Sequence, residues 1–274
     1  MRVADPELNP SLSLPEMRQP MLPDGFRPGL VLMDLDGTLV DSVPDLAHCV
    51  DQMMEQIGRP PRGEKAVRNW VGNGVERLVS RALSGSLEDR PSPEEYARAY
   101  PIFVELYAKH NCQRSVLYPG VREGLGWLHA QGFRLGCVTN KSACFTEPLL
   151  THFDLRGLFE IVISGDSLPE KKPSPLPLLH AAEHFSVEPR QALMVGDSIS
   201  DVKAARAAGF SIVCMSYGYN HGQDIRDAQP DAVIDTLPQL ADLLPEREPD
   251  MGPGRGAGLE AELAAAVASS GAAA

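Results

Sequence analysis

The sequence lacks a long hydrophobic run. No stretch of the 274 residues approaches the length needed to span a bilayer, although 43% of the residues are apolar. The N-terminal region also lacks the apolar segment of a signal peptide and contains acids and prolines instead. We therefore expect a cytoplasmic protein with a sizeable core and no membrane partner.

Cysteine is scarce and follows no recognisable ligand or disulfide pattern. The cysteines are widely spaced and form no CxxC or mixed Cys/His motif, which argues against a zinc site or a disulfide framework. This usage predicts buried thiols in a reducing compartment. The five residues are Cys49, Cys112, Cys137, Cys144 and Cys214.

Basic residues are fewer than acidic ones. The chain has 25 Lys and Arg residues against 37 Asp and Glu residues, which gives a formal net charge of -12 and a pI of about 5.0. This charge repels nucleic acid and anionic membrane surfaces, so we expect no nucleic-acid partner. An anionic substrate would depend on local cations or on a bound metal ion.

Against this background, the stretch VLMDLDGTLVDS at residues 31–42 is distinctive. An apolar run ends in two acids, Asp34 and Asp36, followed by Gly37. Such a run is typical of a buried parallel strand, and the carboxyl ends of parallel strands bind ligands. Two carboxylates so close together repel each other, and a divalent cation offsets that repulsion. A solvated turn explains an isolated DxD, but the full string favours a functional site.

Residues 34–38, D-L-D-G-T, resemble the first motif of the haloacid dehalogenase-like superfamily, D-x-D-G-T. The second Asp is typical of its phosphatase and phosphomutase branches. The resemblance implies that Asp34 is the nucleophile and that Asp36 is the general acid and base.

Two more polar clusters follow predicted strands or occupy loops on the same edge. Thr139 and Asn140 close the strand RLGCVTN, where a hydroxyl and backbone amides suit a phosphate oxygen. A Thr at a strand end is also explained by strand propensity alone. Lys172 precedes Pro173, and its ammonium could neutralise the repulsion between a carboxylate nucleophile and a phosphoryl group. The alternative is a solvated loop charge.

A fourth cluster is the string G-D-S at residues 196–198, with Asp201 shortly after it. Asp197 follows an apolar strand and can ligate a metal ion. Asp201 lies at the start of the next predicted helix, where it either ligates through water or caps that helix.

Together the four clusters match the four motifs of the superfamily in order and spacing. The match covers about residues 29–244. It implies that Mg2+ is held by the Asp34 and Asp197 carboxylates and by the backbone carbonyl of Asp36. It also implies that Lys172, Thr139 and Asn140 bind the phosphoryl oxygens.

Several longer strings resemble the phosphoglycolate phosphatase family of bacteria: W-V-G-N-G, L-Y-P-G-V, V-T-N-K, G-D-S-L-P-E-K-K-P-S-P and Y-G-Y-N-H-G. The resemblance implies hydrolysis of 2-phosphoglycolate to glycolate and phosphate through an aspartyl-phosphate. The alternatives are a phosphatase for another small ester, such as a sugar phosphate or a nucleotide, a phosphomutase, and a non-catalytic protein.

Hydrophobic periodicity predicts the domain organisation. Apolar strands alternate with amphipathic helices, which indicates an α/β fold with a Rossmann-like parallel sheet. An all-helical cap is inserted after the first strand. The predicted units are a flexible arm at 1–28, a core at 29–43 and 118–245, a cap at 44–117 and a disordered tail at 246–274. The sequence is compatible with a monomer or a homodimer.

The cap must recognise the part of the substrate that the four motifs do not contact. The glycine-flanked Asn73 allows a close backbone approach, and Arg81 lies on the helix that follows. Arg81 is a candidate for binding the substrate carboxylate, with a solvated surface arginine as the alternative. The loop from Tyr217 to His221 either lines the edge of the site or packs its aromatic rings.

Overall fold

The computed structural model describes residues 22, 23 and 25–245. The predicted tail, residues 246–274, lies outside the described residues, and so does most of the predicted arm at 1–28. No helix in the described part of the chain is long and apolar enough to cross a membrane.

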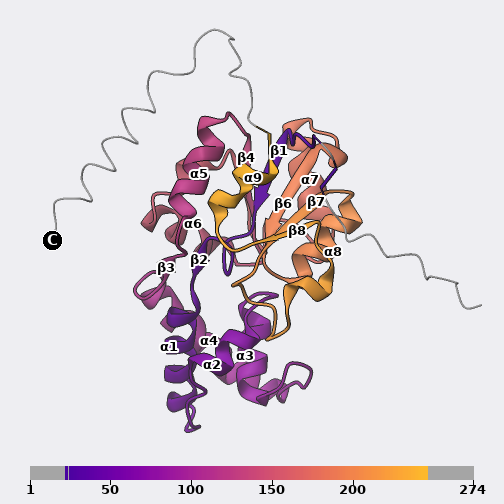
Figure 1. Ribbon diagram of the computed structural model, residues 1–274. Helices are drawn as coiled ribbons and strands as arrows, with labels where there is room; N and C mark the ends of the chain where they lie inside the picture. Colours follow the sequence, from indigo (N-terminus) through magenta and orange to yellow (C-terminus); the bar gives the residue numbers. More distant parts are fainter. Residues whose placement is uncertain (1–21, 24, 246–274) are drawn as a thin grey trace, which may run out of the picture.

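The core is built on a six-stranded sheet whose strands are all parallel (Figure 1). The strand order is β5-β4-β1-β6-β7-β8, which places β1 near the centre. This arrangement confirms the predicted α/β fold. The strand bounds are β1 Leu30–Met33, β4 Leu135–Val138, β5 Ile161–Ile163, β6 Ala192–Gly196, β7 Ser211–Met215 and β8 Ala232–Ile234.

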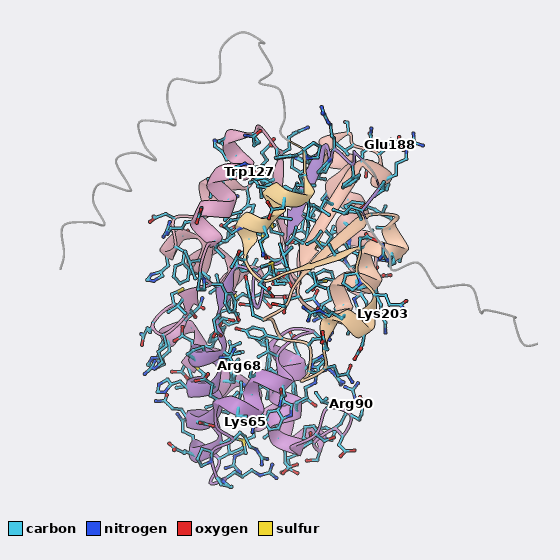
Figure 2. All side chains as sticks on the ribbon, in the orientation of Figure 1. Lys65, Arg68, Arg90, Trp127, Glu188 and Lys203 are labelled. Atoms are coloured by element: carbon cyan, nitrogen blue, oxygen red, sulfur yellow. The ribbon has the colours of Figure 1, made fainter. Side chains whose placement is uncertain are left out.

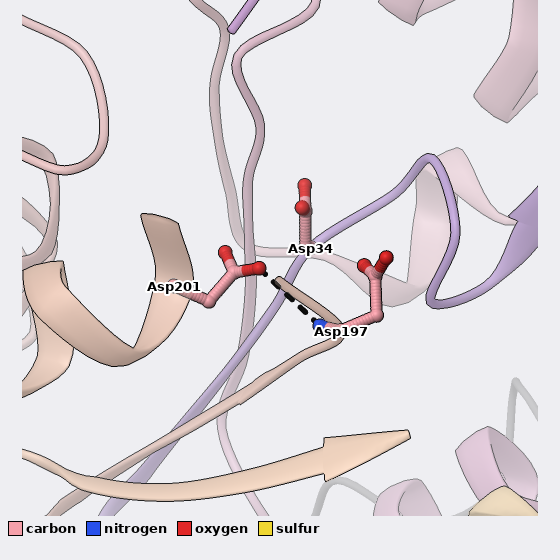
Figure 3. Close-up of side chains that lie close together, drawn as sticks. All are labelled: Asp34, Asp197 and Asp201. Carbon is pink, nitrogen blue, oxygen red and sulfur yellow. Dashed lines mark hydrogen bonds between the residues drawn. The ribbon is translucent and has the colours of Figure 1, made fainter. Parts of the chain in front are cut away.

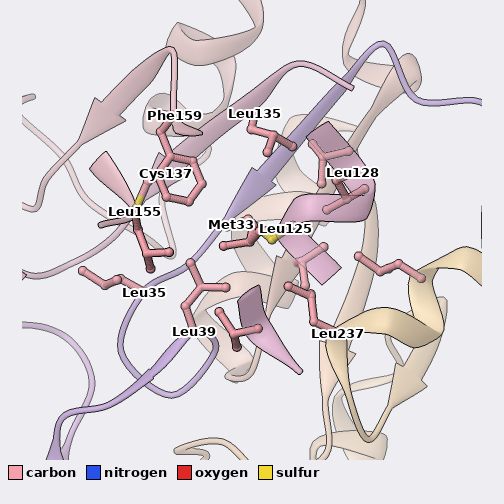
Figure 4. Close-up of a cluster of buried hydrophobic side chains, with 14 of the residues drawn as sticks. Met33, Leu35, Leu39, Leu125, Leu128, Leu135, Cys137, Leu155, Phe159 and Leu237 are labelled. Atoms are coloured by element: carbon pink, nitrogen blue, oxygen red, sulfur yellow. The ribbon is translucent and has the colours of Figure 1, made fainter. Parts of the chain in front are cut away.

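Helices cover both faces of this sheet, which is why its central strands are apolar on both sides. The side chains of β1 alternate between the two faces: Val31 and Met33 join one hydrophobic cluster, and Leu30 and Leu32 join another. Figure 4 shows the first cluster, in which Met33 lies beside Leu125.

The first cluster includes residues of α5 and α6, and the second includes residues of α7 and α8. The helices of the core are α5 Val121–Ala130, α6 Ala143–His152, α7 Leu176–Phe185, α8 Ile199–Ala208 and α9 Leu240–Leu243. Four short 3-10 helices accompany them in the described chain, at η1 Arg156–Leu158, η2 Pro189–Gln191, η3 Ile225–Ala228 and η4 Leu237–Gln239.

Four helices between β1 and the rest of the core form the cap, which lies below the core in Figure 1. They are α1 Val43–Gln56, α2 Glu64–Trp70, α3 Val75–Ser84 and α4 Pro93–His110. Their apolar faces make a third hydrophobic cluster, which includes Phe103 and Tyr107. Figure 2 shows the charged Lys65, Arg68 and Arg90 on this cap, and Trp127, Glu188 and Lys203 on the core.

A short antiparallel ribbon joins the two regions. Strand β2, Val40–Asp41, pairs with strand β3, Val116–Leu117, where the chain passes between core and cap. The expectation that the inserted segment is entirely helical is therefore wrong at 116–117. The buried carboxylate of Asp45 accepts hydrogen bonds from the Ser115 amide and hydroxyl, at 2.9 and 2.6 Å. These bonds hold the start of α1 against the returning chain.

The cysteines form no disulfide within the described residues. Cys49, Cys137 and Cys214 are buried, as expected. The expectation is wrong for Cys144, which is exposed near the start of α6, and Cys112 is only partly buried.

Candidate active site

Three carboxylates meet at the carboxyl edge of the sheet (Figure 3). Asp34 directly follows β1, Asp197 directly follows β6, and Asp201 lies in the first turn of α8. One oxygen of each lies within 4.8 Å of the others. Because β1 and β6 are neighbouring parallel strands, residues 163 positions apart in the sequence share one site.

Asp197 is held by the chain around it. One carboxylate oxygen accepts a hydrogen bond from the Thr38 hydroxyl at 2.7 Å, and the other accepts one from the Tyr219 amide at 2.6 Å. Gly37 and Gly218 pass so close that a Cβ on either would clash with this carboxylate. The glycine in D-L-D-G-T is therefore required by the approach of Asp197 as well as by its own positive φ of 89°.

Lys172 lies between two of the carboxylates. Its Nζ is 3.0 Å from Asp34 Oδ1 and 2.7 Å from Asp201 Oδ1, and it donates to the Val138 carbonyl at 2.6 Å. The side chain is 1% exposed, so the solvated alternative is wrong. The preceding Lys171 is half-buried and pairs with Glu76 of the cap at 3.7 Å.

Electrostatics in this cluster favour a bound cation. Burial raises the pKa of Asp34 to about 7, although the Lys172 ammonium opposes the shift. Burial and the charges of Asp201 and Asp34 raise the pKa of Asp197 well above its ordinary value. Burial lowers the pKa of Lys172, but the attraction of Asp201 and Asp34 outweighs it and the net shift is upward. A divalent ion would stabilise the ionised carboxylates, and the oxygen donors present suit such an ion.

Asp201 caps α8, which was one of its two predicted roles. Its Oδ2 accepts hydrogen bonds from the Ser198 hydroxyl at 2.7 Å, the Ser198 amide at 3.0 Å and the Asp197 amide at 3.2 Å. Its Oδ1 faces Lys172. The carboxylate therefore orders the loop that carries Asp197 and fixes the position of Lys172.

Asp36 points to a different cation, Lys141. The Lys141 Nζ lies 3.1 and 3.2 Å from the two carboxylate oxygens of Asp36 and donates to the Tyr107 hydroxyl at 2.6 Å. The Lys141 side chain is 2% exposed. Sequence reasoning assigned no role to Lys141 or Tyr107, because neither the T-N-K string nor the periodicity of α4 indicates that the two side chains meet.

The second motif follows β4, on the other side of β1. The Thr139 hydroxyl accepts a hydrogen bond from the Lys141 amide at 3.2 Å, and Asn140 Nδ2 donates to the Lys172 carbonyl at 2.8 Å. Both residues line the same cavity as Asp34. The structure thus brings together the core residues that the four motifs indicated.

The cap contributes one wall of this cavity with the loop between α2 and α3. Residues 72–74 line it, and all three have positive φ angles. Asn73 Nδ2 also donates to Ser200 Oγ of the core at 3.2 Å. The two glycines leave this part of the cavity wall without a bulky side chain.

Arg81 supports that loop from behind. Its guanidinium donates to the Trp70 carbonyl at 2.7 Å, the Gly72 carbonyl at 3.2 Å and Asn73 Oδ1 at 3.1 Å. Arg81 is 6% exposed, so the alternative of a solvated surface arginine is wrong. Its place beneath the loop suits a positioning role better than a contact with substrate.

The loop at residues 217–221 fills both of its predicted roles. Tyr219 and His221 line the cavity, and the Tyr217 ring stacks on Tyr118 with ring centroids 4.0 Å apart. The Tyr219 hydroxyl donates to Asp41 of β2 at 2.5 Å. His221 Nδ1 lies 2.9 Å from the Asn69 carbonyl, which joins this loop to the cap.

Comparison with known proteins gives a consistent result. Residues 31–215 match the model of the haloacid dehalogenase-like hydrolase family. The chain is 64% identical over 218 residues to a phosphoglycolate phosphatase of Nitrosococcus oceani, covering 80% of this chain and 97% of that protein. It is 46% identical over 214 residues to a phosphoglycolate phosphatase of Nitrosospira multiformis, covering 78% and 94%.

A solved structure agrees with these relatives. The crystal structure of a predicted phosphoglycolate phosphatase from Haemophilus somnus matches with a TM-score of 0.74 at 37% identity, covering 78% of this chain and 96% of that one.

Proposed function

The chain belongs to the haloacid dehalogenase-like hydrolase family and is a phosphoric monoester hydrolase, and we propose that its substrate is 2-phosphoglycolate. The observation that carries the proposal is the arrangement of Asp34, Asp36 and Lys172 at the edge of the sheet, in a cavity that core and cap line together. The names of the two bacterial relatives support the choice of substrate.

The first chemical step belongs to Asp34. Its carboxylate oxygen attacks phosphorus while the bond from phosphorus to the glycolate oxygen breaks, which gives an aspartyl-phosphate. Asp36 donates a proton to the departing oxygen. Lys172, Thr139 and the Asn140 amide bind phosphoryl oxygens and compensate their charge.

The second step regenerates the enzyme. Asp36 takes a proton from a water molecule, the water oxygen attacks phosphorus, and the bond to Asp34 breaks. Phosphate leaves and Asp34 returns to the carboxylate. The cap would limit the entry of bulk water, because its loop at residues 72–74 lines the same cavity as the carboxylates.

We further propose that the cation is Mg2+. The Asp34 and Asp197 carboxylates and the Asp36 backbone carbonyl would hold it, because oxygen-only ligands suit Mg2+ better than zinc. When bound, the ion supplies positive charge to the phosphoryl oxygens. Asp201 has its oxygens directed at Lys172 and at the loop, so we assign it a positioning role.

Several expectations about the whole protein remain part of this proposal. They are a small phosphate ester as the partner, the cytoplasm as the compartment, a monomer or homodimer as the assembly, and domain boundaries at 43/44 and 117/118. A phosphatase for a sugar phosphate or nucleotide is the second candidate function, because the core residues contact only the phosphoryl end. A phosphomutase is a third.

Phosphate release from a panel of esters tests the proposal. The panel contains 2-phosphoglycolate, glucose 6-phosphate, a nucleotide and an aryl phosphate, each assayed with Mg2+ and with EDTA. We expect 2-phosphoglycolate to have the highest kcat/KM and EDTA to abolish release. An equal kcat/KM for the aryl phosphate would contradict the substrate assignment. Isomerisation of a glucose phosphate without phosphate release would indicate the mutase.

A further inference from the structure

The charged side chains that line the cavity are unevenly distributed. Among the described lining residues, the lysines and arginines are Lys141 and Lys172 alone. Lys172 forms ion pairs with Asp34 and Asp201, at the end of the site that we assign to the phosphoryl group. Burial lowers the pKa of the lining His221, which favours its neutral form. Lys141 is therefore the lysine away from the phosphoryl end.

Lys141 lies where the leaving group must pass. Its Nζ is 3.1 Å from Asp36 Oδ1, and Asp36 is the acid that the proposed mechanism places at the leaving oxygen. In 2-phosphoglycolate a single methylene separates that oxygen from the carboxyl carbon. A group that contacts Asp36 is thus within reach of the substrate carboxylate.

Resting on the proposed function, we propose that Lys141 binds the carboxylate of the substrate and selects phosphate esters that carry a carboxylate next to the leaving oxygen. An ammonium has three N–H donors, and its partners among the described side chains are Asp36 and Tyr107. A substrate carboxylate would be a further acceptor. Burial of the Lys141 side chain strengthens such a pairing relative to one in water.

Tyr107 makes this recognition depend on the cap. It belongs to α4, and its hydroxyl accepts a hydrogen bond from Lys141 Nζ at 2.6 Å. The ring lies between Phe103 of the cap, with centroids 5.6 Å apart, and Phe145 of the core, at 4.7 Å. The Lys141 ammonium is 4.9 Å from the centroid of the Tyr107 ring. Tyr107 is therefore a positioning residue that orients Lys141 when the cap is closed.

The test compares two substrates that differ in charge. Ethyl phosphate has the same phosphoryl end and a similar length but no carboxylate. We measure kcat/KM for 2-phosphoglycolate and for ethyl phosphate with Mg2+, and take their ratio for each variant. Lys141→Met should lower the ratio by roughly 10- to 100-fold, the range for a hydrogen bond to a charged group. Lys171→Met is the matched control, because Lys171 does not line the cavity and the loss of its half-buried ion pair with Glu76 should leave the ratio within about twofold.

Conservative variants distinguish a loss of carboxylate binding from a loss of folding. Lys141→Arg keeps the charge and should retain most of the ratio even if Lys141→Met does not fold. Tyr107→Phe removes one hydrogen bond and should raise KM for 2-phosphoglycolate by about 3- to 10-fold, with little change in KM for ethyl phosphate.

The outcomes distinguish this inference from the proposed function. A wild-type ratio near one would reject 2-phosphoglycolate as the preferred substrate. A high wild-type ratio that survives Lys141→Met would overturn the inference and leave the substrate assignment intact. An equal loss for both substrates would also overturn it, because Lys141 would then act only by positioning Asp36. Two other variants decide the matter if Lys141→Met does not fold. The inference would be contradicted if the ratio of the two kcat/KM values stayed unchanged in Tyr107→Phe but fell to about one in Lys141→Arg.

Discussion

The core and the cap contribute different things to one cavity. The core contributes carboxylates whose positions are set by the ends of buried strands, as Asp34 follows β1 and Asp197 follows β6. The cap has its own hydrophobic cluster and contributes the loop at residues 72–74 to the cavity, and its buried Tyr107 hydroxyl contacts the lining residue Lys141. On the proposed function, the chemistry belongs to the core, and we propose that substrate selection takes place where the two regions meet.

This division predicts that variants of the core carboxylates stop turnover of every substrate, whereas variants at the contact between core and cap, such as Lys141 and Tyr107, change the preference among substrates. The largest effect is expected for Asp34→Asn, because an amide is a poor nucleophile towards phosphorus. We expect kcat to fall by at least about 10^4-fold for 2-phosphoglycolate and for an aryl phosphate alike. Steady-state phosphate release measures it. Substantial turnover by this variant would remove the covalent step from the mechanism.

The next largest effect concerns the cation. Asp197→Asn weakens one of the two carboxylate ligands that we propose for Mg2+, and it should raise the Mg2+ concentration for half-maximal activity by roughly 10- to 100-fold or more. Titration of activity with Mg2+ measures the shift. Asp231→Asn is a control, because its carboxylate pairs with Arg206 and neither residue lines the cavity. An unchanged Mg2+ requirement in Asp197→Asn would place the ion elsewhere.

A pH dependence follows from the raised pKa of Asp34. In the metal-free protein this carboxyl holds its proton up to about pH 7, and Mg2+ must displace that proton. Mg2+ affinity should therefore fall by about tenfold per pH unit below 7. Because the folded-state pKa exceeds the unfolded value, the metal-free protein loses stability as pH rises from about 4 to about 7.

The measurement for this prediction is thermal unfolding with Mg2+ and with EDTA. We expect the rise in Tm on adding Mg2+ to be larger at about pH 8 than at about pH 6. A larger rise at the lower pH would show that the carboxyl is not protonated in the metal-free protein.

The smallest effect is expected for a variant of Arg81, the residue that supports the cap loop. Arg81→Met removes the bonds to the Trp70 and Gly72 carbonyls and should raise KM for 2-phosphoglycolate by about 5-fold while kcat changes little. The free energy of unfolding should fall by about 1–3 kcal/mol, because buried carbonyls lose their donors. Arg77→Met on the same helix is the control for loss of charge. A fall in kcat with KM unchanged would place Arg81 in the chemistry instead.

Much of the core could be predicted because the motifs and the hydrophobic pattern that indicate it lie in short, continuous stretches of the sequence. Asp34, Asp197 and Lys172 each stand in a short string, and the alternation of apolar strands and helices indicated the parallel sheet before any contact was known. Parallel strands bring their carboxyl ends to one edge, so the order of the motifs was enough to predict a common site.

The contacts between core and cap could not be predicted in the same way. Asp36 and Lys141 are 105 positions apart, and Tyr107 reads in the sequence as one more apolar position on α4. Arg81 faces inward and donates to the Trp70 and Gly72 carbonyls, and helical periodicity does not reveal these partners. The two-residue pairing of β2 with β3 is too short to produce an alternating pattern.

The covalent role of Asp34 is the central claim, and Asp36→Asn tests it most directly. An aryl phosphate needs little help from a proton donor to lose its leaving group, but hydrolysis of the intermediate still needs the base. Mixing this variant with an aryl phosphate and Mg2+ should give a burst of one phenol per enzyme, followed by slow turnover. Mass spectrometry of the quenched protein should then find one phosphoryl group on the peptide that contains Asp34. The absence of a burst together with an unmodified Asp34 peptide would contradict the account.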